Sequence, residues 1–235
     1  MTRSGRVPLA RALSKLGISS RTAATAQILA GRVAVDGRVI RDPSHPVVPE
    51  RARITVDGET ARRGRWRLLL LNKPRGTVTT RRDPQGRPTV FDLLGDEARG
   101  LVAVGRLDLA TTGLLLLTSD TQLAHRLTDP ESGVVRRYVV TVRGNLTDDE
   151  AARMIAGFDD IHADSVHVRK RSARESHLIV ELREGRNREI RRLCASVGHE
   201  VTALKRIAFG GLELGDLPPG QWRSVSRDEV RQAFG

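Results

Sequence analysis

The fold of this chain is decided by the stretch Gly105-Arg106-Leu107-Asp108-Leu109-Ala110-Thr111-Thr112-Gly113-Leu114-Leu115-Leu116-Leu117-Thr118-Ser119-Asp120. Two short apolar runs, at 101–104 and 114–117, are bounded by glycine and predict buried strands. Arg106 and Asp108 lie between these strands, where a charge has to be paired or used because burying it alone is costly. Asp108 is therefore either a structural ion-pair partner or a catalytic carboxylate.

The pattern GRLDxxTxGLLLLTxD resembles the central motif of pseudouridine synthases, most closely that of the bacterial ribosomal-RNA branch called the Rsu family. The resemblance implies that Asp108 is the catalytic residue and that Arg106 helps to hold the RNA open. Arg106 and Asp108 are two residues apart, and in an extended chain side chains at this spacing point to the same side. Because the isomerisation conserves all atoms and is redox-neutral, we expect no cofactor.

Charge is distributed unevenly along the 235 residues. The chain has 40 Lys and Arg against 28 Asp and Glu, a formal net charge of +12, and residues 1–65 hold 13 basic and 5 acidic side chains. A small basic module ahead of a nearly balanced one is typical of a part that binds a polyanion. A solubilising surface, or the arginine bias of a GC-rich genome, is the alternative explanation.

Several classes of protein are disfavoured by what the sequence lacks. Cys194 is the only cysteine, which excludes an intrachain disulfide and fits a reducing cytoplasm. The first residues have no apolar signal core, and no apolar run approaches the ~20 residues of a membrane span. No Cys/His cluster has metal-ligand spacing, and no phosphate loop is present. We therefore expect a cytoplasmic protein without membrane, metal or nucleotide cofactor.

Residues 1–60 are predicted to form two helices and a hairpin. Leucines recur at helical spacing over 7–17, and a second helix, with Ile28 and Leu29 as apolar anchors, ends near residue 30. Asp36-Gly37 between alternating apolar residues predicts a hairpin. This order resembles the RNA-binding domain of ribosomal protein S4, although a generic basic module is the alternative. The resemblance implies that basic side chains here face RNA phosphates, namely Arg11, Lys15, Arg21 and Arg32.

A basic linker is predicted at 61–66, ahead of a catalytic domain at 67–235. Its first strand leads into Asn72-Lys73-Pro74-Arg75-Gly76, and NKPxG resembles the first motif of the Rsu family. Lys73 and Arg75 are expected to contact RNA phosphate. A turn between strands explains Pro74 and Gly76 equally well.

The only tyrosine, Tyr138, lies in a strand predicted from the alternation over 134–142. In the family, such a strand carries the tyrosine that stacks on the target base, with a basic residue two places earlier. That residue is Arg136 here, where lysine is usual, and the exchange keeps the charge but changes its geometry. The resemblance thus implies stacking by Tyr138 and an RNA contact by Arg136. A place in the core is the alternative for Tyr138.

The segment EGRNREIRRLC at 184–194 resembles the third motif of the family. Its apolar residues, with Val197, fall on one face of a helix. Arg191 borders this face and can reach inward, whereas Arg188 is expected to reach outward and to contact RNA. The resemblance implies that Arg191 pairs with Asp108 and orients it. It also implies that Leu204, in the closing strand, packs under the target base, a core leucine being the alternative.

These expectations describe an α+β protein. A small S4-like RNA-binding domain precedes a pseudouridine synthase domain built on a mixed, mainly antiparallel sheet flanked by helices. The predicted function is isomerisation of one uridine in rRNA by an aspartate-dependent base-flipping mechanism, in a monomer that acts on a ribosomal subunit or assembly intermediate. Analogy with the commonest bacterial form favours large-subunit (23S) rRNA. The alternatives are a small-subunit (16S) rRNA synthase and a non-catalytic RNA-binding assembly factor, the latter disfavoured by the joint presence of Asp108, Tyr138 and Arg191.

Overall fold

The computed structural model describes residues 5–61 and 65–235, which divide into two compact units. The smaller unit holds the described part of Met1–Arg67 together with Gly100–Val102 and Thr118–Gln122, and the larger unit holds the other described residues. Of the predicted linker at 61–66, residues 62–64 lie outside the described residues.

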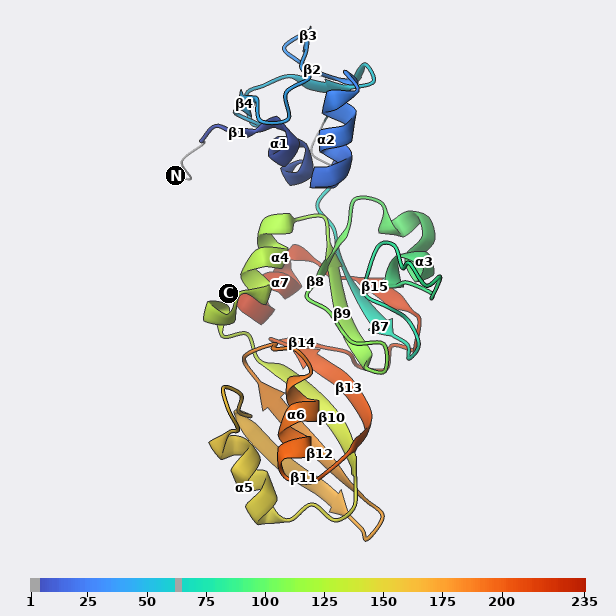
Figure 1. Cartoon of the computed structure of the whole chain (residues 1–235), viewed down its shortest axis with the longest axis vertical. Coiled ribbons are helices and arrows are strands. Elements are labelled where there is room, and N and C mark those ends of the chain that lie inside the picture. The colour runs from blue at the N-terminus through green and yellow to red at the C-terminus, as the bar shows by residue number, and fades with distance from the viewer. Residues whose placement is uncertain (1–4, 62–64) are drawn as a thin grey trace. The chain divides into compact units, whose positions relative to one another are not determined.

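The smaller unit is built from short helices and strands around its own apolar core (Figure 1). Its elements are β1 (Val7–Pro8), α1 (Leu9–Lys15), α2 (Arg21–Leu29), β2 (Val33–Val35), β3 (Arg38–Val39), β4 (Pro46–Val47), β5 (Ile54–Val56) and β6 (Glu59–Thr60). The predicted hairpin is confirmed, because Asp36 and Gly37 join β2 to β3 with φ of 48° and 83°, as a type I′ turn requires.

One predicted core residue of the smaller unit is exposed. Ile28 is buried, as predicted, but Leu29 is 57% exposed. Successive helical residues are rotated by about 100°, so Leu29 leaves the buried face that Ile28 occupies. The inward face of α2 is completed by the small residue Ala24, which explains how so weakly apolar a helix packs.

A mixed sheet organises the larger unit; it has nine strands within the described residues. Its path is β11 (Ser165–Arg171), β12 (Glu175–Leu182), β10 (Arg136–Arg143), β13 (Val201–Phe209), β9 (Thr112–Thr118), β7 (Leu68–Lys73) and β15 (Trp222–Ser224), with β14 (Leu212–Glu213) on β13 and β8 (Val102–Val104) on β9. β13 and β9 are parallel, whereas the pairs along β11, β12, β10 and β13 are antiparallel. The predicted mixed, mainly antiparallel sheet is therefore confirmed.

Helices cover this sheet and complete its core. They are α3 (Val90–Leu94), α4 (Thr121–Thr128), α5 (Asp148–Ala156), α6 (Glu189–Ser196) and α7 (Arg227–Phe234). α5 packs against β11 and α6 against β13 (Figure 1). The predicted apolar face of α6 is confirmed by the burial of Ile190, Leu193, Cys194 and Val197. Nowhere in 5–61 or 65–235 is a helix both long and apolar enough to cross a bilayer.

Candidate active site

Asp108 lies in the loop that joins β8 to β9, and backbone hydrogen bonds hold this loop in shape. Thr111 N donates to Asp108 O over 3.0 Å, which closes the turn. Thr79 Oγ1 donates to Leu107 O over 2.9 Å and also accepts from Leu107 N over 3.3 Å. The segment that follows the NKPxG motif therefore supports the backbone on which Asp108 is carried.

Lys73 supports the same loop from inside the protein, so its predicted contact with RNA is wrong. It is the last residue of β7, a central strand whose six residues are all buried. Its side chain has no exposed surface, and Nζ donates to Pro74 O over 3.0 Å and to Thr111 O over 2.8 Å. Burial lowers the pKa of Lys73 to about 8, against the opposing charge of Asp108. Arg75, by contrast, is exposed and stays a predicted RNA contact.

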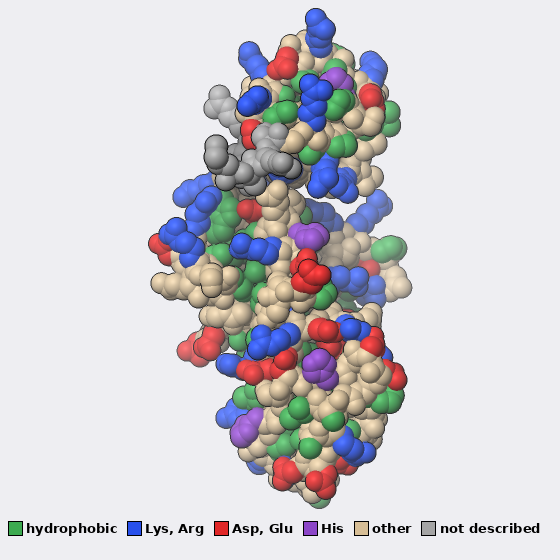
Figure 2. Space-filling view, turned by 90° about the vertical axis from the view of Figure 1, so that its left-hand side faces the viewer, with side chains coloured by type: hydrophobic (Ala, Val, Ile, Leu, Met, Phe, Trp, Pro, Cys, Tyr) green, Lys and Arg blue, Asp and Glu red, His purple; other side chains and the backbone are tan. Residues whose placement is uncertain are grey.

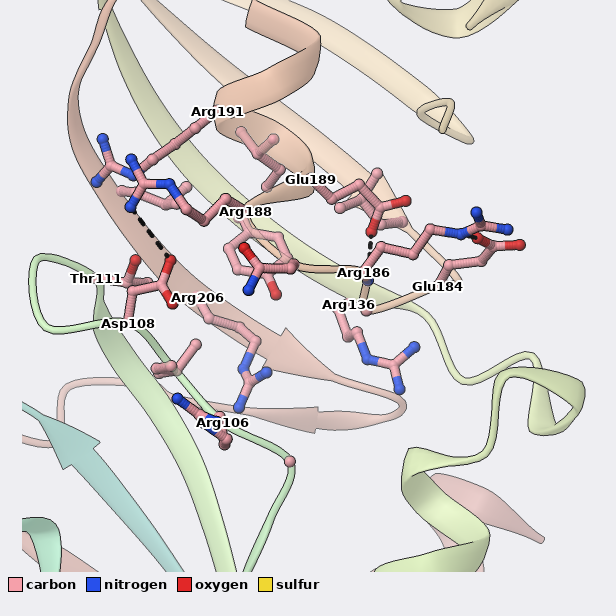
Figure 3. A pocket seen from close by; sticks show the side chains of 18 of the residues that line it. Arg106, Asp108, Thr111, Arg136, Glu184, Arg186, Arg188, Glu189, Arg191 and Arg206 are labelled. Atoms are coloured by element: carbon pink, nitrogen blue, oxygen red, sulfur yellow. Dashed lines mark hydrogen bonds and ion pairs between the residues drawn. The ribbon is translucent and has the colours of Figure 1, made fainter. Parts of the chain in front are cut away.

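Asp108 opens onto a pocket of about 590 Å³ (Figure 3). The pocket is lined chiefly by the loop at 105–111, the strands β10 and β13 and the segment at 184–191 of the larger unit, and Thr128, Pro130 and Leu182 complete its wall. Most of the predicted site residues lie on its wall, namely Arg106, Asp108, Arg136, Tyr138, Arg188, Arg191 and Leu204.

Two neighbouring strands form one wall of the pocket. Along β10 the side chains alternate, so that Arg136 and Tyr138 point to the same buried side. On β13, Leu204 and Arg206 do the same, and Arg206 lies opposite Tyr138 in the register. Tyr138 is 9% and Leu204 8% exposed. A flat apolar group that enters the pocket would therefore meet both residues.

The cation closest to Asp108 differs from the expected one. Arg188 Nη1 lies 3.9 Å from Asp108 Oδ2 and forms the ion pair drawn in Figure 3. Arg191, the predicted partner, instead donates from Nη1 to Val201 O over 2.9 Å. Burial lowers the pKa of Arg191 and Arg188 lowers it further, whereas Asp108 opposes both effects. Arg191 is thus a neighbouring charge of Asp108, and Arg188 is the direct partner.

The backbone explains why Arg188 reaches Asp108. Arg188 precedes the first residue of α6 with φ of 51° and ψ of 31°, a left-handed conformation that is uncommon for a residue with a side chain. Such strain persists only where the surrounding structure holds it, and it is frequent at functional sites. Motif spacing shows that arginines recur at 186, 188, 191 and 192, but not which of them this turn directs towards the loop.

Among the residues of the pocket wall that were not predicted as site residues are Glu189, Arg206 and Phe209. Burial raises the pKa of Glu189, whose carboxylate accepts a hydrogen bond from Arg186 N over 3.1 Å. Arg206 is 3% exposed. It lies two residues after Leu204, so the period of a strand would have placed both side chains on one face.

The four predicted RNA contacts of the smaller unit differ in whether an acidic side chain pairs with them. Arg11 and Arg21 are exposed. Lys15 pairs with a glutamate at 3.5 Å, and Arg32 makes a two-fold hydrogen bond with Asp57. Lys and Arg side chains are numerous on the face of this unit seen in Figure 2. Among these four predicted contacts, Arg11 and Arg21 are therefore the ones whose charge is free to attract a polyanion.

The pocket offers a limited set of chemical groups. It holds the half-exposed carboxylate of Asp108, the carboxylates of Glu184 and Glu189, one phenol, Tyr138, and several guanidinium groups. No group of three or more His, Cys, Asp or Glu side chains in the described parts of the chain is arranged to hold a metal ion. The arrangement suits nucleophilic or general-base chemistry by a carboxylate on an anionic substrate with a planar ring.

Comparison with known proteins gives consistent matches over both parts of the chain. Residues 67–196 match the model of the RNA pseudouridylate synthase family, and residues 7–52 match the S4 domain. An uncharacterized RNA pseudouridine synthase of Mycobacterium leprae is 40% identical over 98% of this chain and 93% of its own length. Ribosomal large subunit pseudouridine synthase B of Pseudomonas aeruginosa is 40% identical over 94% of this chain and 60% of its own length. A crystal structure of a pseudouridylate synthase aligns with a TM-score of 0.66 at 26% identity, over 97% of this chain and 99% of that one.

Proposed function

The chain belongs to the RNA pseudouridylate synthase family, and from this premise we propose that it converts one uridine of large-subunit ribosomal RNA to pseudouridine with Asp108 as the catalytic carboxylate. The observation that carries the assignment of Asp108 is its position in one pocket with Tyr138, Leu204, Arg188 and Arg191. The Pseudomonas relative, which is named for the large ribosomal subunit, supports the choice of RNA.

The reaction replaces one bond by another. The bond between uracil N1 and ribose C1′ breaks, the freed uracil rotates, and a bond between C5 and C1′ forms. C5 loses a proton and N1 gains one, so all atoms are conserved. A uridine in folded RNA has to leave its stack before these atoms can be reached. A cavity of about 590 Å³ lies within the range of sites that enclose small ligands.

Each residue of the pocket has a role in this scheme. The carboxylate of Asp108 acts as the nucleophile or base, and Arg188, which pairs with it, orients it. Tyr138 stacks on the uracil, which Leu204 supports from β13. Arg106, which is exposed at the mouth, occupies the space that the flipped nucleotide leaves in the RNA. We expect a cytoplasmic protein that acts as a monomer, with a pocket that is lined within one chain.

The experiment that tests this proposal maps pseudouridines in rRNA from cells with and without the gene. Carbodiimide adducts on pseudouridine stop reverse transcription and identify the position. One stop in 23S rRNA should disappear without the gene and return with the wild-type gene but not with Asp108→Asn. A stop lost from 16S rRNA would redirect the proposal to the small subunit, and an unchanged pattern in both rRNAs would contradict it.

A further inference from the structure

Two buried arginines lie on the pocket wall away from Asp108. Arg136 is 5% and Arg206 3% exposed, and both line the pocket. Their guanidinium carbons lie over the ring of Phe209, at 5.1 and 5.0 Å from its centroid. In Figure 3 Arg206 lies between Arg106 and Arg136, whereas Asp108, Arg188 and Arg191 form a separate group. The pocket therefore has a second cationic region besides the one at the carboxylate.

An irregularity in the β10–β13 ladder brings these three side chains together. Tyr138 pairs with Arg206, but Arg137 pairs with Ala208, so Ile207 is an extra residue on β13. An extra residue reverses the alternation of the strand beyond it. Phe209 thus shares a face with Arg206, although the two are three residues apart, and it lies opposite Arg136. The bulge therefore places both guanidinium groups next to the ring of Phe209.

The charge of the two arginines is not balanced by the protein. Neither forms an ion pair with a carboxylate among the residues that the structure describes. Arg136 donates to backbone carbonyls of Val134, Arg183 and Leu127. The nearby acid is Glu189, whose carboxylate is itself buried and opposed by Glu184. At most one negative charge therefore stands against two positive charges.

Arg206 also has an unused donor. Its Nε donates to Leu114 O over 2.7 Å, but its buried Nη2 has no hydrogen-bond partner. A buried donor left unpaired costs about 1–3 kcal/mol. If Arg206 only linked β13 to β9, the hydrogen bond of Nε would be enough, and the buried unpaired donor at Nη2 would have no explanation. A ligand oxygen in the pocket would satisfy this donor and balance the remaining charge.

We propose that Arg206, together with Arg136, binds one phosphodiester group of the RNA strand next to the nucleotide in the pocket. A phosphodiester carries a single negative charge, which matches the unbalanced charge, and its two free oxygens suit the planar fork of a guanidinium. The proposal rests on the proposed function, because the strand enters the pocket only with the flipped nucleotide. Beyond the proposed function, it assigns a phosphodiester ligand to the second cationic region and an RNA contact to Arg206.

The test combines neutral linkages in the RNA with changes at Arg206. The probe is a synthetic RNA hairpin around the uridine that the wild-type protein modifies, in which single phosphodiesters near that uridine are replaced one at a time by methylphosphonate. For the wild type, one linkage should lower affinity by about 10- to 100-fold, as loss of one charge-assisted contact predicts. Arg206→Gln should lose a similar factor on unmodified RNA and nothing further at that linkage.

Two further variants make the outcome decisive. Arg99→Gln removes a guanidinium whose side chain is 88% exposed and outside the pocket, so it should keep the full sensitivity to the neutral linkage. Arg206→Lys keeps the charge without the fork and should reduce that sensitivity, which gives a result if Arg206→Gln does not fold. Thermal melting identifies folded variants.

Two results would overturn the proposal. One is a wild type that tolerates every neutral linkage, and the other is a set of folded Arg206 variants that remain as sensitive as the wild type. Because the hairpin is taken from whichever rRNA the wild type modifies, an error in the choice of subunit leaves this test intact. A protein that modified no RNA would instead refute the proposed function itself.

Discussion

At the scale of single residues, Asp108 has little to do with stability. Its side chain is 41% and that of Arg188 57% exposed, and they pair at 3.9 Å; an exposed pair of this kind contributes ~0–1 kcal/mol. We expect Asp108→Asn to abolish pseudouridine formation while the free energy of unfolding falls by less than about 1 kcal/mol. Single-turnover assays and urea denaturation check both parts. Asp96→Asn, at a fully exposed side chain, should leave turnover unchanged; a folded Asp108→Asn protein with substantial turnover would contradict the assignment.

Lys73 predicts a specific dependence of stability on pH. Burial lowers its pKa from 10.5 to about 8 in the folded protein. Between these values the unfolded chain binds the proton and the folded chain does not, so stability rises with pH. Relative to Lys73→Met, the wild type should gain up to about 3 kcal/mol in free energy of unfolding from pH 8 to 10.5. Urea denaturation at several pH values measures this difference. Lys170→Met, at an exposed site, is the control. If the difference in free energy of unfolding between wild type and variant changed with pH as little for Lys73→Met as for Lys170→Met, the lowered pKa of Lys73 would be contradicted.

Motif positions were predictable at this scale, but side-chain directions were not. Asp108, Tyr138 and Leu204 were expected at the site because the motifs around them resemble those of the family, and all three line the pocket. The directions of Lys73 and Arg188 could not be predicted, because they depend on a central strand and on a left-handed turn that form only in the folded chain. Basic residues in a motif therefore indicate a charged site without showing which of them meets the ligand.

At the scale of elements, the contact between β9 and β13 depends on Gly113. Its φ is +99°, and a Cβ there would lie 2.2 Å from Arg206 O. Gly113→Ala should destabilise the protein by at least ~1–3 kcal/mol more than Gly86→Ala, because Gly86 has a similar φ of +70° but open space around it. Urea denaturation of both variants gives the comparison. RNA affinity should also fall, since β9 and β13 carry the Asp108 loop and Arg206. Equal destabilisation by the two changes would show that the strands accommodate a Cβ at residue 113 without a loss of stability.

Elements with strong local patterns were predictable, and those set by distant contacts were not. The Asp36-Gly37 hairpin and the apolar face of α6 follow from turn chemistry and helical period. The strand β15 pairs with β7 across about 150 residues of sequence, and no local signal indicates such a partner. The bulge at Ile207 is equally hidden, because it reflects the fit of two strands rather than the preference of one residue.

At the scale of the whole molecule, composition indicated two parts but not their full membership. The basic excess of the first 65 residues predicted a separate module, and the smaller unit has its own core around Leu9, Leu13 and Ile28. The contact pattern also assigns Gly100–Val102 and Thr118–Gln122 to that unit. One segment before the catalytic motif and one that includes the end of this motif thus belong to the smaller unit, and hydrophobic patterns do not predict this. The domain limits at 60 and 67 accordingly stay a prediction.

We expect the smaller unit to bind RNA and the larger unit to carry out the reaction. Residues 1–60 carry ten basic and five acidic side chains, while all residues that line the pocket belong to the larger unit. Removing 1–60 should therefore weaken RNA binding and flatten its dependence on salt, because each lost phosphate contact removes about 0.7–0.9 from the slope of log affinity against log salt. The rate of a single turnover at saturating RNA should change little. In the full chain, replacing the exposed Arg11 and Arg21 by glutamine tests the charges without removing the module, and should reduce the slope by up to about 2. Salt titrations of binding, with circular dichroism to confirm folding, measure these effects. A truncated protein that bound and modified rRNA as well as the full chain, with the same slope, would show that the module does not target the enzyme.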